Sequence, residues 1–426
     1  MKYLDSEFLL PFRYKDFTYM WIATLFSGAA MWTTNLARAA LVWDISESSN
    51  WVGLILFALM IPSLLIPLVA GFIADLLDRK KMLIIASIGS LISNGLMVLV
   101  LVTFDLSNTI LVYIVFLSAL EGVARSFRMP ASQSLVPNLV SKDYIPKAVA
   151  LLNANQHGAK LVGPLIVGFL TIILKTGFIE VFIVCFILNL AAVLTILNIR
   201  TESTGIIDSE KSFGANFLQG FDYLYHNTLM LVILVVAMLH CALTMTYESL
   251  TPSIGEEVLI LGSSSYTSLM LFAGIGALLG SILVVTLKTR IGGYLFFFSA
   301  LLSGVGPVLF AFSDNIYLIW LSLILIGASQ AAFMTLTHVM MQVIIPDAIR
   351  GRVTSIYIMH VGGMMALFNW INGYMADITN PRTVLMFMGI VFIAAVIISL
   401  VNKTAKTLFS LGITRDSFPN LESSPV

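Results

Sequence analysis

Charged side chains are scarce in this chain. Asp, Glu, Lys and Arg make up 11% of its 426 residues, whereas hydrophobic residues make up 58%. A soluble globular protein carries about 25% charged residues, so the apolar surface of this chain must face lipid rather than water. The formal net charge is zero and the basic residues form small loop clusters, which argues against a nucleic-acid partner.

Cysteines and catalytic signatures are also nearly absent. Cys185 and Cys241 are the only cysteines, and they lie in apolar runs of different halves, which argues against a disulfide, a metal site or a redox pair. The sequence has no G-x-x-x-x-G-K-[S/T], H-E-x-x-H, C-x-x-C or G-x-S-x-G motif. We therefore expect no enzyme activity, no cofactor, no metal and no ATP hydrolysis through such a phosphate-binding loop.

Long apolar runs fill most of the sequence. A spanning helix needs about 20 mostly apolar residues, and such runs should be helical because backbone polar groups find no water partner in hydrocarbon. Twelve runs qualify, near residues 17–43, 51–74, 82–103, 109–129, 147–173, 178–199, 229–250, 264–287, 291–312, 315–340, 353–376 and 381–401. The sequence thus predicts an all-α integral membrane protein with twelve transmembrane helices.

The longest polar interval, residues 200–228, separates six runs from six. The predicted organisation is a segment 1–16, a six-helix half 17–199, the linker 200–228, a six-helix half 229–401 and a tail 402–426. With both termini on one side, that side carries 19 lysines and arginines, and the other carries Lys175 and Arg382. Because cytoplasmic loops hold the excess of Lys and Arg, we expect cytoplasmic termini and a multi-pass protein of the bacterial inner or plasma membrane.

The loop Gly71–Lys81 (GFIADLLDRKK) places five charges in seven positions between the second and third runs. It resembles the signature of the major facilitator superfamily, roughly G-x-x-x-D-R-x-G-R-R, with Leu76 and Asp78 as departures. The matching positions are Gly71, Asp75, Arg79, Lys80 and Lys81. Leu76, Asp78 and residues 346–353 (PDAIRGRV) resemble the sequences of one branch of that superfamily. This branch contains enterobactin exporters, macrolide-efflux proteins and transmembrane secretion effectors.

This resemblance implies two pseudo-symmetric six-helix halves and a conformational gate. The gate residues it implies are Gly71, Asp75, Asp78, Arg79, Lys80, Arg350 and Arg352. A carboxylate such as Asp75 near a helix N-terminus is stabilised by about 0.3–1 kcal/mol. The alternative is that the cations of this loop only anchor the topology.

Glycines mark two predicted spans. Gly158, the pair Gly163-Pro164 and Gly168 in the fifth span resemble, imperfectly, the glycine- and proline-rich motif of exporting antiporters, and ordinary packing is the alternative. Gly276 and Gly280 form a GxxxG pair in the eighth span, which indicates close packing against another helix.

Ionisable residues inside spans are costly, roughly 2.5–3.5 kcal/mol each at the helix centre. Glu121 and Arg125 share a face of the fourth span because they are four residues apart. Lys160, on the next antiparallel span, lies within reach of Glu121. We therefore predict a proton-exchanging charge network of Glu121, Arg125 and Lys160. A static network that holds two helices together is the alternative.

In the superfamily that the loop resembles, the first, fourth, seventh and tenth spans surround the central cavity. We expect Arg38, Asn35, Glu248 and Gln330 as cavity residues, although Glu248 equally suits the outer interface. The predicted function is proton-coupled efflux of a small organic compound, such as a siderophore, macrolide or other metabolite, by a monomer in the lipid bilayer. Alternatives are an uptake symporter or facilitator and, more weakly, a non-transporting membrane receptor or scaffold.

Overall fold

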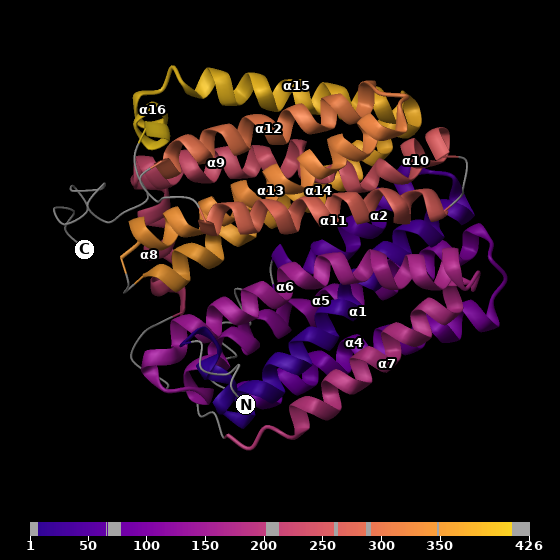
Figure 1. Ribbon diagram of the computed structural model, residues 1–426, viewed down its shortest axis with the longest axis horizontal. Coiled ribbons are helices and arrows are strands. Elements are labelled where there is room, and N and C mark those ends of the chain that lie inside the picture. Colours follow the sequence, from indigo (N-terminus) through magenta and orange to yellow (C-terminus); the bar gives the residue numbers. More distant parts are fainter. Residues whose placement is uncertain are drawn as a thin grey trace. The chain divides into compact units, whose positions relative to one another are not determined.

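A computed structural model describes residues 7–64, 66, 78–201, 213–259, 263–286, 291–346 and 349–410, and every element in them is helical (Figure 1). A helix lies at each of the twelve expected intervals. In chain order these helices are α1 (Lys15–Ser46), α2 (Ser49–Met60), α4 (Arg79–Thr103), α5 (Asn108–Leu139), α6 (Ile145–Gly168), α7 (Phe178–Leu197), α9 (Thr228–Leu243), α11 (Ser263–Thr286), α12 (Gly292–Phe312), α13 (Ile316–Ile344), α14 (Arg350–Ile378) and α15 (Pro381–Ser399).

Shorter helices flank these spans. They are η2 (Glu7–Arg13), η3 (Lys142–Tyr144), the π-helical turn η4 (Phe169–Ile173), α8 (Phe213–His226), η5 (Met245–Ser249), α10 (Thr251–Leu259) and α16 (Lys403–Ser410). Eight of the described helices are long and apolar enough to cross a membrane by themselves. Helices α1 and α14 fall short of that measure because each mixes charged, amide and hydroxyl side chains into its apolar sequence.

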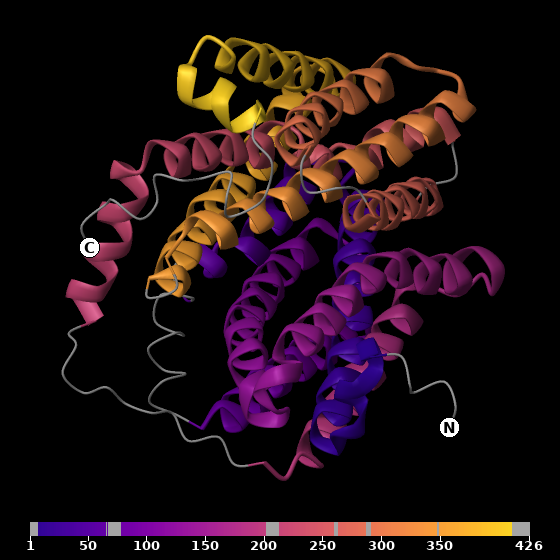
Figure 2. The ribbon, with the colours of Figure 1, turned by 60° about the vertical axis from the view of Figure 1, so that its left-hand side comes forward.

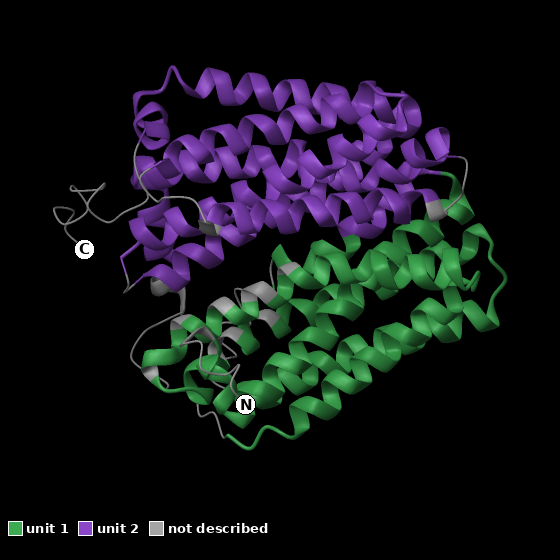
Figure 3. Cartoon of the chain, viewed as in Figure 1, with its two compact units in different colours: residues 1–47, 58–209 green, residues 48–57, 210–426 purple. Residues whose placement is uncertain are grey.

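The chain forms two compact units (Figure 3). Unit 1 comprises residues 1–47 and 58–209, and unit 2 comprises residues 48–57 and 210–426, so the boundary falls inside the expected linker and the start of α2 belongs to unit 2. In unit 1, α1 packs against α6 and α7, and α4 packs against α5 and α7. In unit 2, α13 packs against α11 and α12, and α12 against α15, as the two ribbon views show (Figures 1 and 2).

Glycines set the closest helix approach in unit 2. A Cβ atom on Gly276 or Gly280 of α11 would lie 2.1 Å from the carbonyl oxygen of Ile324 or Ala328 in α13. From the other side, a Cβ on Gly327 would lie 2.0 Å from the carbonyl oxygen of Ala273. The GxxxG pair therefore packs backbone against backbone, as the sequence indicated.

The seventh span differs from its expected form. Residues 229–250 were expected to be one helix, but α9 ends at Leu243, the 3-10 turn η5 follows, and α10 begins at Thr251. Hydroxyl groups in this region bond to backbone carbonyls three or four residues earlier; they belong to Thr244, Thr246, Ser249 and Thr251. Such bonds compete with the backbone hydrogen bonds of the helix, and Pro252 has no backbone N–H to donate. Together these features account for the break.

Candidate functional site

A buried polar cluster lies inside unit 1, where α1, α4 and α5 meet. We call it the Arg38–Glu121 cluster; its members are Arg38, Ser90, Ser93, Ser118, Glu121 and Arg128. Arg38 is 1% exposed, and its Nη2 donates to Ser93 Oγ at 3.1 Å, while its Nη1 lies 3.5 Å from Ser118 Oγ. Two serines of different helices thus fix the guanidinium of α1.

Glu121 supplies the negative charge of the cluster. It is 3% exposed, and its Oε1 accepts a hydrogen bond of 2.9 Å from Ser90 Oγ. Arg128 Nη1 lies 3.3 Å from the same hydroxyl oxygen, and both Arg38 and Arg128 interact electrostatically with the Glu121 carboxylate. The second carboxylate oxygen, Oε2, has no hydrogen-bond partner in the described part of the chain.

The other predicted residues of unit 1 lie as follows. The Nζ of Lys160 sits 5.1 Å from the ring centroid of Trp32, a cation–π contact between α6 and α1. Arg125 is half-buried on α5. Asn35 is half-buried on α1, and among the described residues its Oδ1 has no hydrogen-bond partner.

A second polar cluster surrounds the broken seventh span in unit 2. His240 is fully buried, and its Nδ1 lies 2.8 Å from Thr244 Oγ1 and 3.2 Å from Ser303 Oγ. Gln330 of α13 is 3% exposed and donates through Nε2 to the carbonyl oxygen of Thr244 at 3.0 Å. This amide therefore satisfies a carbonyl at the point where α9 ends.

Several polar atoms of this second cluster have no hydrogen-bond partner among the described residues. They are His240 Nε2, Tyr247 Oη, Gln330 Oε1 and Asn372 Oδ1. The Asn372 amide of α14 donates to Thr246 Oγ1 at 2.6 Å, so α12, α13 and α14 all contribute polar groups where α9 gives way to η5. Glu248, the remaining predicted cavity residue, is half-buried on η5.

The predicted gate falls partly outside the described residues, because Gly71 and Asp75 lie there. Asp78 precedes α4, and its carboxylate accepts a 2.9 Å hydrogen bond from the backbone N–H of Lys80. Arg79 Nη1 donates to Asn138 Oδ1 of α5 at 3.1 Å. The beginning of α4 is therefore capped and also joined to the end of α5.

Arg350 and Arg352 lie in the first turn of α14. Arg350 donates to the carbonyl oxygen of Ile345 at 3.2 Å, and Arg352 donates to Gln219 Oε1 of α8 at 2.7 Å. Gly220 lies beside this contact, since its Cβ would be 2.8 Å from Ile356 Cδ1. Arg352 thus fastens the surface helix α8 to the start of α14.

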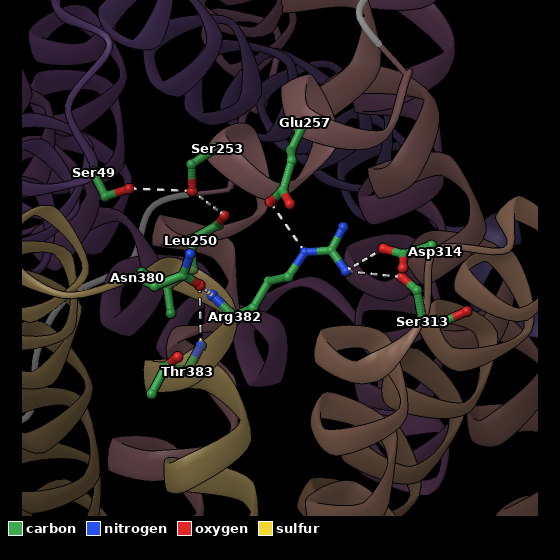
Figure 4. A network of polar contacts seen from close by, with 9 residues as sticks. All are labelled: Ser49, Leu250, Ser253, Glu257, Ser313, Asp314, Asn380, Arg382 and Thr383. Atoms are coloured by element: carbon green, nitrogen blue, oxygen red, sulfur yellow. Dashed lines mark hydrogen bonds and ion pairs between the residues drawn. The ribbon is translucent and has the colours of Figure 1, made fainter.

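A third polar group surrounds Arg382 at the opposite, predicted outer end of unit 2 (Figure 4). Its Nε lies 3.0 Å from Glu257 Oε2 of α10, and its Nη1 lies 2.7 Å from Asp314 Oδ1. Nη1 also donates to the carbonyl oxygen of Ser313 at 3.2 Å. One guanidinium joins the start of α15 to α10 and to the α12–α13 connection.

The order and packing of the described helices are consistent with the major facilitator fold, and solved structures share this fold. Similar folds are a POT family transporter in complex with 5-aminolevulinic acid (TM-score 0.73, 12% identity, 91% of this chain and 96% of that chain) and a D-xylose-proton symporter (TM-score 0.70, 14% identity, 91% and 97%). The nucleoside transporter NupG is also similar (TM-score 0.68, 15% identity, 91% and 100%).

Sequence comparisons identify the branch. The pattern of the transmembrane secretion effector family matches residues 6–421, so the chain belongs to that family. A staphyloferrin A transporter of Staphylococcus aureus (strain NCTC 8325 / PS 47) is 24% identical over 363 residues, which cover 84% of this chain and 89% of that protein. The family suggested by the Gly71–Lys81 loop is thereby confirmed, and the protein is a multi-pass membrane transporter.

Proposed function

We propose that this protein exports a small organic compound by proton antiport, with its two halves alternating between access to either side of the membrane. The observation that carries this proposal is Glu121, a carboxylate that is 3% exposed within a predicted span. An ionisable residue at this depth is expensive and marks an ion or substrate pathway by default.

Glu121 is well suited to exchange a proton. Ser90 holds its Oε1 in place, while Oε2 keeps an open acceptor position within the described residues. In antiport, the ionised oxygen would accept a hydrogen bond from the substrate, and a proton arriving from outside would remove that acceptor and release the substrate. Arg38 and Arg128 keep the carboxylate oriented between turnovers.

The substrate class follows from the relative and from the polar clusters. The relative is named for transport of staphyloferrin A, which supports a siderophore, with macrolides and other metabolites as further members of the proposed class. His240, Gln330 and Asn372 add hydrogen-bonding groups in unit 2, where a broken helix is a frequent element of transporter sites. We assign Arg38, Asn35, Glu248 and Gln330 to the cavity on this basis.

Uptake by symport is the second candidate, and one observation favours it. The Arg38–Glu121 cluster contains two cationic groups and one anionic group, so protonation of Glu121 would strengthen binding of an anionic substrate. Proton and substrate would then move together rather than in opposite directions.

The remaining parts of the proposal concern gating and placement. Gly71, Asp75, Asp78, Arg79, Lys80, Arg350 and Arg352 form the proposed cytoplasmic gate. The protein is proposed to act as a monomer in a bacterial inner or plasma membrane, with both termini in the cytoplasm. The excess of cations at the predicted inner ends supports this orientation.

Transport of a labelled siderophore in membrane vesicles tests the proposal. Vesicles with an imposed proton gradient of either direction are compared for the wild type, Glu121→Gln and the control Glu180→Gln, whose carboxylate lies exposed at the start of α7. We expect the control to retain gradient-driven export. In Glu121→Gln, the proton gradient should no longer drive export, and export should no longer depend on pH. Unchanged, pH-dependent export by Glu121→Gln would exclude this residue from coupling. Movement of the siderophore in the same direction as the protons would establish symport in place of antiport.

A further inference from the structure

The hydroxyl of Ser90 on α4 joins two oppositely charged side chains of α5. Ser90 is fully buried, and its Oγ accepts a 3.3 Å hydrogen bond from Arg128 Nη1 and donates one of 2.9 Å to Glu121 Oε1. Arg128 follows Glu121 by seven residues, about two helical turns. A single hydroxyl of the neighbouring helix therefore connects the two charged groups inside unit 1.

The direction of these two hydrogen bonds follows from the chemistry of the groups. A guanidinium can only donate, so Ser90 Oγ is the acceptor for Arg128. A serine hydroxyl carries one hydrogen, and that of Ser90 is directed at the Glu121 carboxylate. Consecutive hydrogen bonds in a protein interior polarise and strengthen one another. The positive charge of Arg128 therefore strengthens the hydrogen bond that Ser90 donates to Glu121.

The backbone at Ser90 is also held in place. Asn94 Nδ2 donates to the carbonyl oxygen of Ser90 at 2.9 Å, and Asn94 Oδ1 accepts a 2.9 Å hydrogen bond from Thr34 Oγ1 of α1. Asn94 and Thr34 are each 1% exposed. These contacts tie the turn of α4 that carries Ser90 to α1, so the hydroxyl is kept in position to bind Glu121.

The helices around α5 carry further ionisable side chains. The ionisable residues of these helices and of α5 itself are Arg38 of α1, Arg125 and Arg128 of α5, Lys160 of α6 and Cys185 of α7. Of these, Arg38, Arg128 and Cys185 interact electrostatically with Glu121. All of them remain in place when Ser90 is replaced by alanine, so that substitution isolates the effect of the hydroxyl.

We propose that Ser90, supported by Arg128, sets the pH at which Glu121 takes up its proton, an inference that rests on the proposed role of Glu121 in proton exchange. Ser90 is a positioning residue, because its hydrogen bond to Oε1 favours the ionised carboxylate. Oε2 has no hydrogen-bond partner within the described residues and is the oxygen that receives the proton. The Arg128–Ser90 pair thus opposes protonation through Oε1 and leaves Oε2 accessible to the proton.

Infrared difference spectroscopy of the purified full-length protein tests the inference without a transport assay. The signal is the protonated carboxylic acid band that the wild type shows and Glu121→Gln lacks, followed as a function of pH. We expect Ser90→Ala to move the midpoint of this band upward by about one pH unit, because losing a hydrogen bond to the ionised form favours the protonated form. Ser90→Thr, which retains the hydroxyl, should restore the wild-type midpoint.

Ser87→Ala is the matched control. Ser87 lies three residues before Ser90 on α4 and is 1% exposed, and its hydroxyl has no hydrogen-bond partner among the described residues. Removing it should leave the midpoint unchanged. Equal shifts in Ser87→Ala and Ser90→Ala, or no shift in Ser90→Ala, would overturn the role of Ser90.

A double-mutant cycle tests the contribution of Arg128. Arg128→Gln should also raise the midpoint, and the shift in the double variant Ser90→Ala/Arg128→Gln should be smaller than the sum of the single shifts, because Arg128 acts partly through Ser90. Additive shifts would overturn this connection. A Glu121 band that appears at no pH would overturn the proposed proton exchange and this inference with it, whereas a band whose midpoint ignores Ser90 would overturn the inference alone.

Discussion

Asp377, at the end of α14, accepts a hydrogen bond from the backbone N–H of Ser49 with an N···O distance of 2.8 Å. The same carboxylate accepts from the backbone N–H of Asn50 at 3.2 Å and from Ser48 Oγ at 2.5 Å. An acid of one helix thereby caps the first turn of another, and this contact lies wholly within unit 2. Gly373 allows the approach, because its Cβ would lie 2.2 Å from the carbonyl oxygen of Ser49.

Replacing Asp377 should weaken this cap. In Asp377→Asn the negative charge near the N-terminus of α2 is lost, and one of the two acceptor oxygens becomes a donor. We expect a loss of stability of about 0.3–1 kcal/mol, measured as a lower thermal unfolding midpoint in detergent. Asp105→Asn removes an exposed carboxylate from the α4–α5 connection and serves as the control. Equal midpoints for the two variants would show that the cap adds no stability.

The glycines of the fifth span give a matched pair on one helix. In α6, a Cβ on Gly163 would lie 2.7 Å from the backbone carbon of Trp32, whereas a Cβ on Gly158 meets no atom within 4 Å. We expect Gly163→Ala to destabilise the protein by about 1–3 kcal/mol through overpacking against α1. Gly158→Ala should be neutral or slightly stabilising, since alanine is the better helix former. Thermal unfolding of both variants checks this difference, and similar effects would contradict a packing role specific to Gly163.

The spans could be predicted from the sequence because hydropathy alone requires them. Each of the twelve expected runs contains a helix. The seventh span itself was predicted, since residues 228–249 form one apolar stretch long enough to cross a membrane. Its change from α-helix to 3-10 helix after Leu243 was missed, because hydropathy does not distinguish the two kinds of helix. The available signal was the cluster of threonines and serines between Thr244 and Thr251, whose hydroxyls can bond to backbone carbonyls three or four residues earlier, followed directly by Pro252.

The sequence singled out Arg125, four residues from Glu121, but not Arg128, although residues four and seven positions along an α-helix share a face. Arg128 is 9% exposed and reaches Ser90, which also binds Glu121. The contributions of Ser90 and Arg38 depend on how α4 and α1 pack against α5, and no spacing along the chain encodes that packing.

The stability of unit 1 should depend on pH through Asp16. Partial burial raises the pKa of Asp16, but hydrogen bonds from the Thr201 hydroxyl and from the N–H groups of Thr201 and Arg200, together with the charge of Lys80, outweigh it and lower the pKa below its ordinary value. A lowered pKa in the folded state stabilises the protein at pH values above the unfolded pKa, about 3.9. This contribution disappears as the pH falls through the folded pKa.

Thermal unfolding of Asp16→Asn across pH checks this linkage. At pH 6 the variant should unfold at a lower temperature than the wild type, and the difference should shrink below about pH 4. Asp143→Asn, which removes an exposed carboxylate on η3, should show no such convergence. A constant difference between wild type and Asp16→Asn at every pH would contradict the assignment of this effect to the Asp16 charge.

Arg382 should stabilise the predicted outer end of unit 2. The side chain of Arg382 is 17% exposed, whereas those of Glu257 and Asp314 are 53% and 90% exposed. Solvent therefore screens the ion pair of Arg382 with Asp314 most strongly. The ion pair with Glu257 and the hydrogen bond to the Ser313 carbonyl should contribute most of the stabilisation. We expect Arg382→Gln to lose about 1 kcal/mol, and Arg382→Lys to fall between it and the wild type, because an ammonium cannot reproduce the fork of a guanidinium.

The control for this prediction is Lys175→Gln, which removes the other cation predicted at the outer side from an exposed position in unit 1. Thermal unfolding in low and high salt separates the two sites. At low salt only the Arg382 variants should unfold earlier, and high salt should narrow the difference only in part, since buried or partly buried pairs are screened less than exposed ones. A difference that vanishes completely in high salt would mean that Arg382 acts as a surface charge and does not join α10, α15 and the α12–α13 connection.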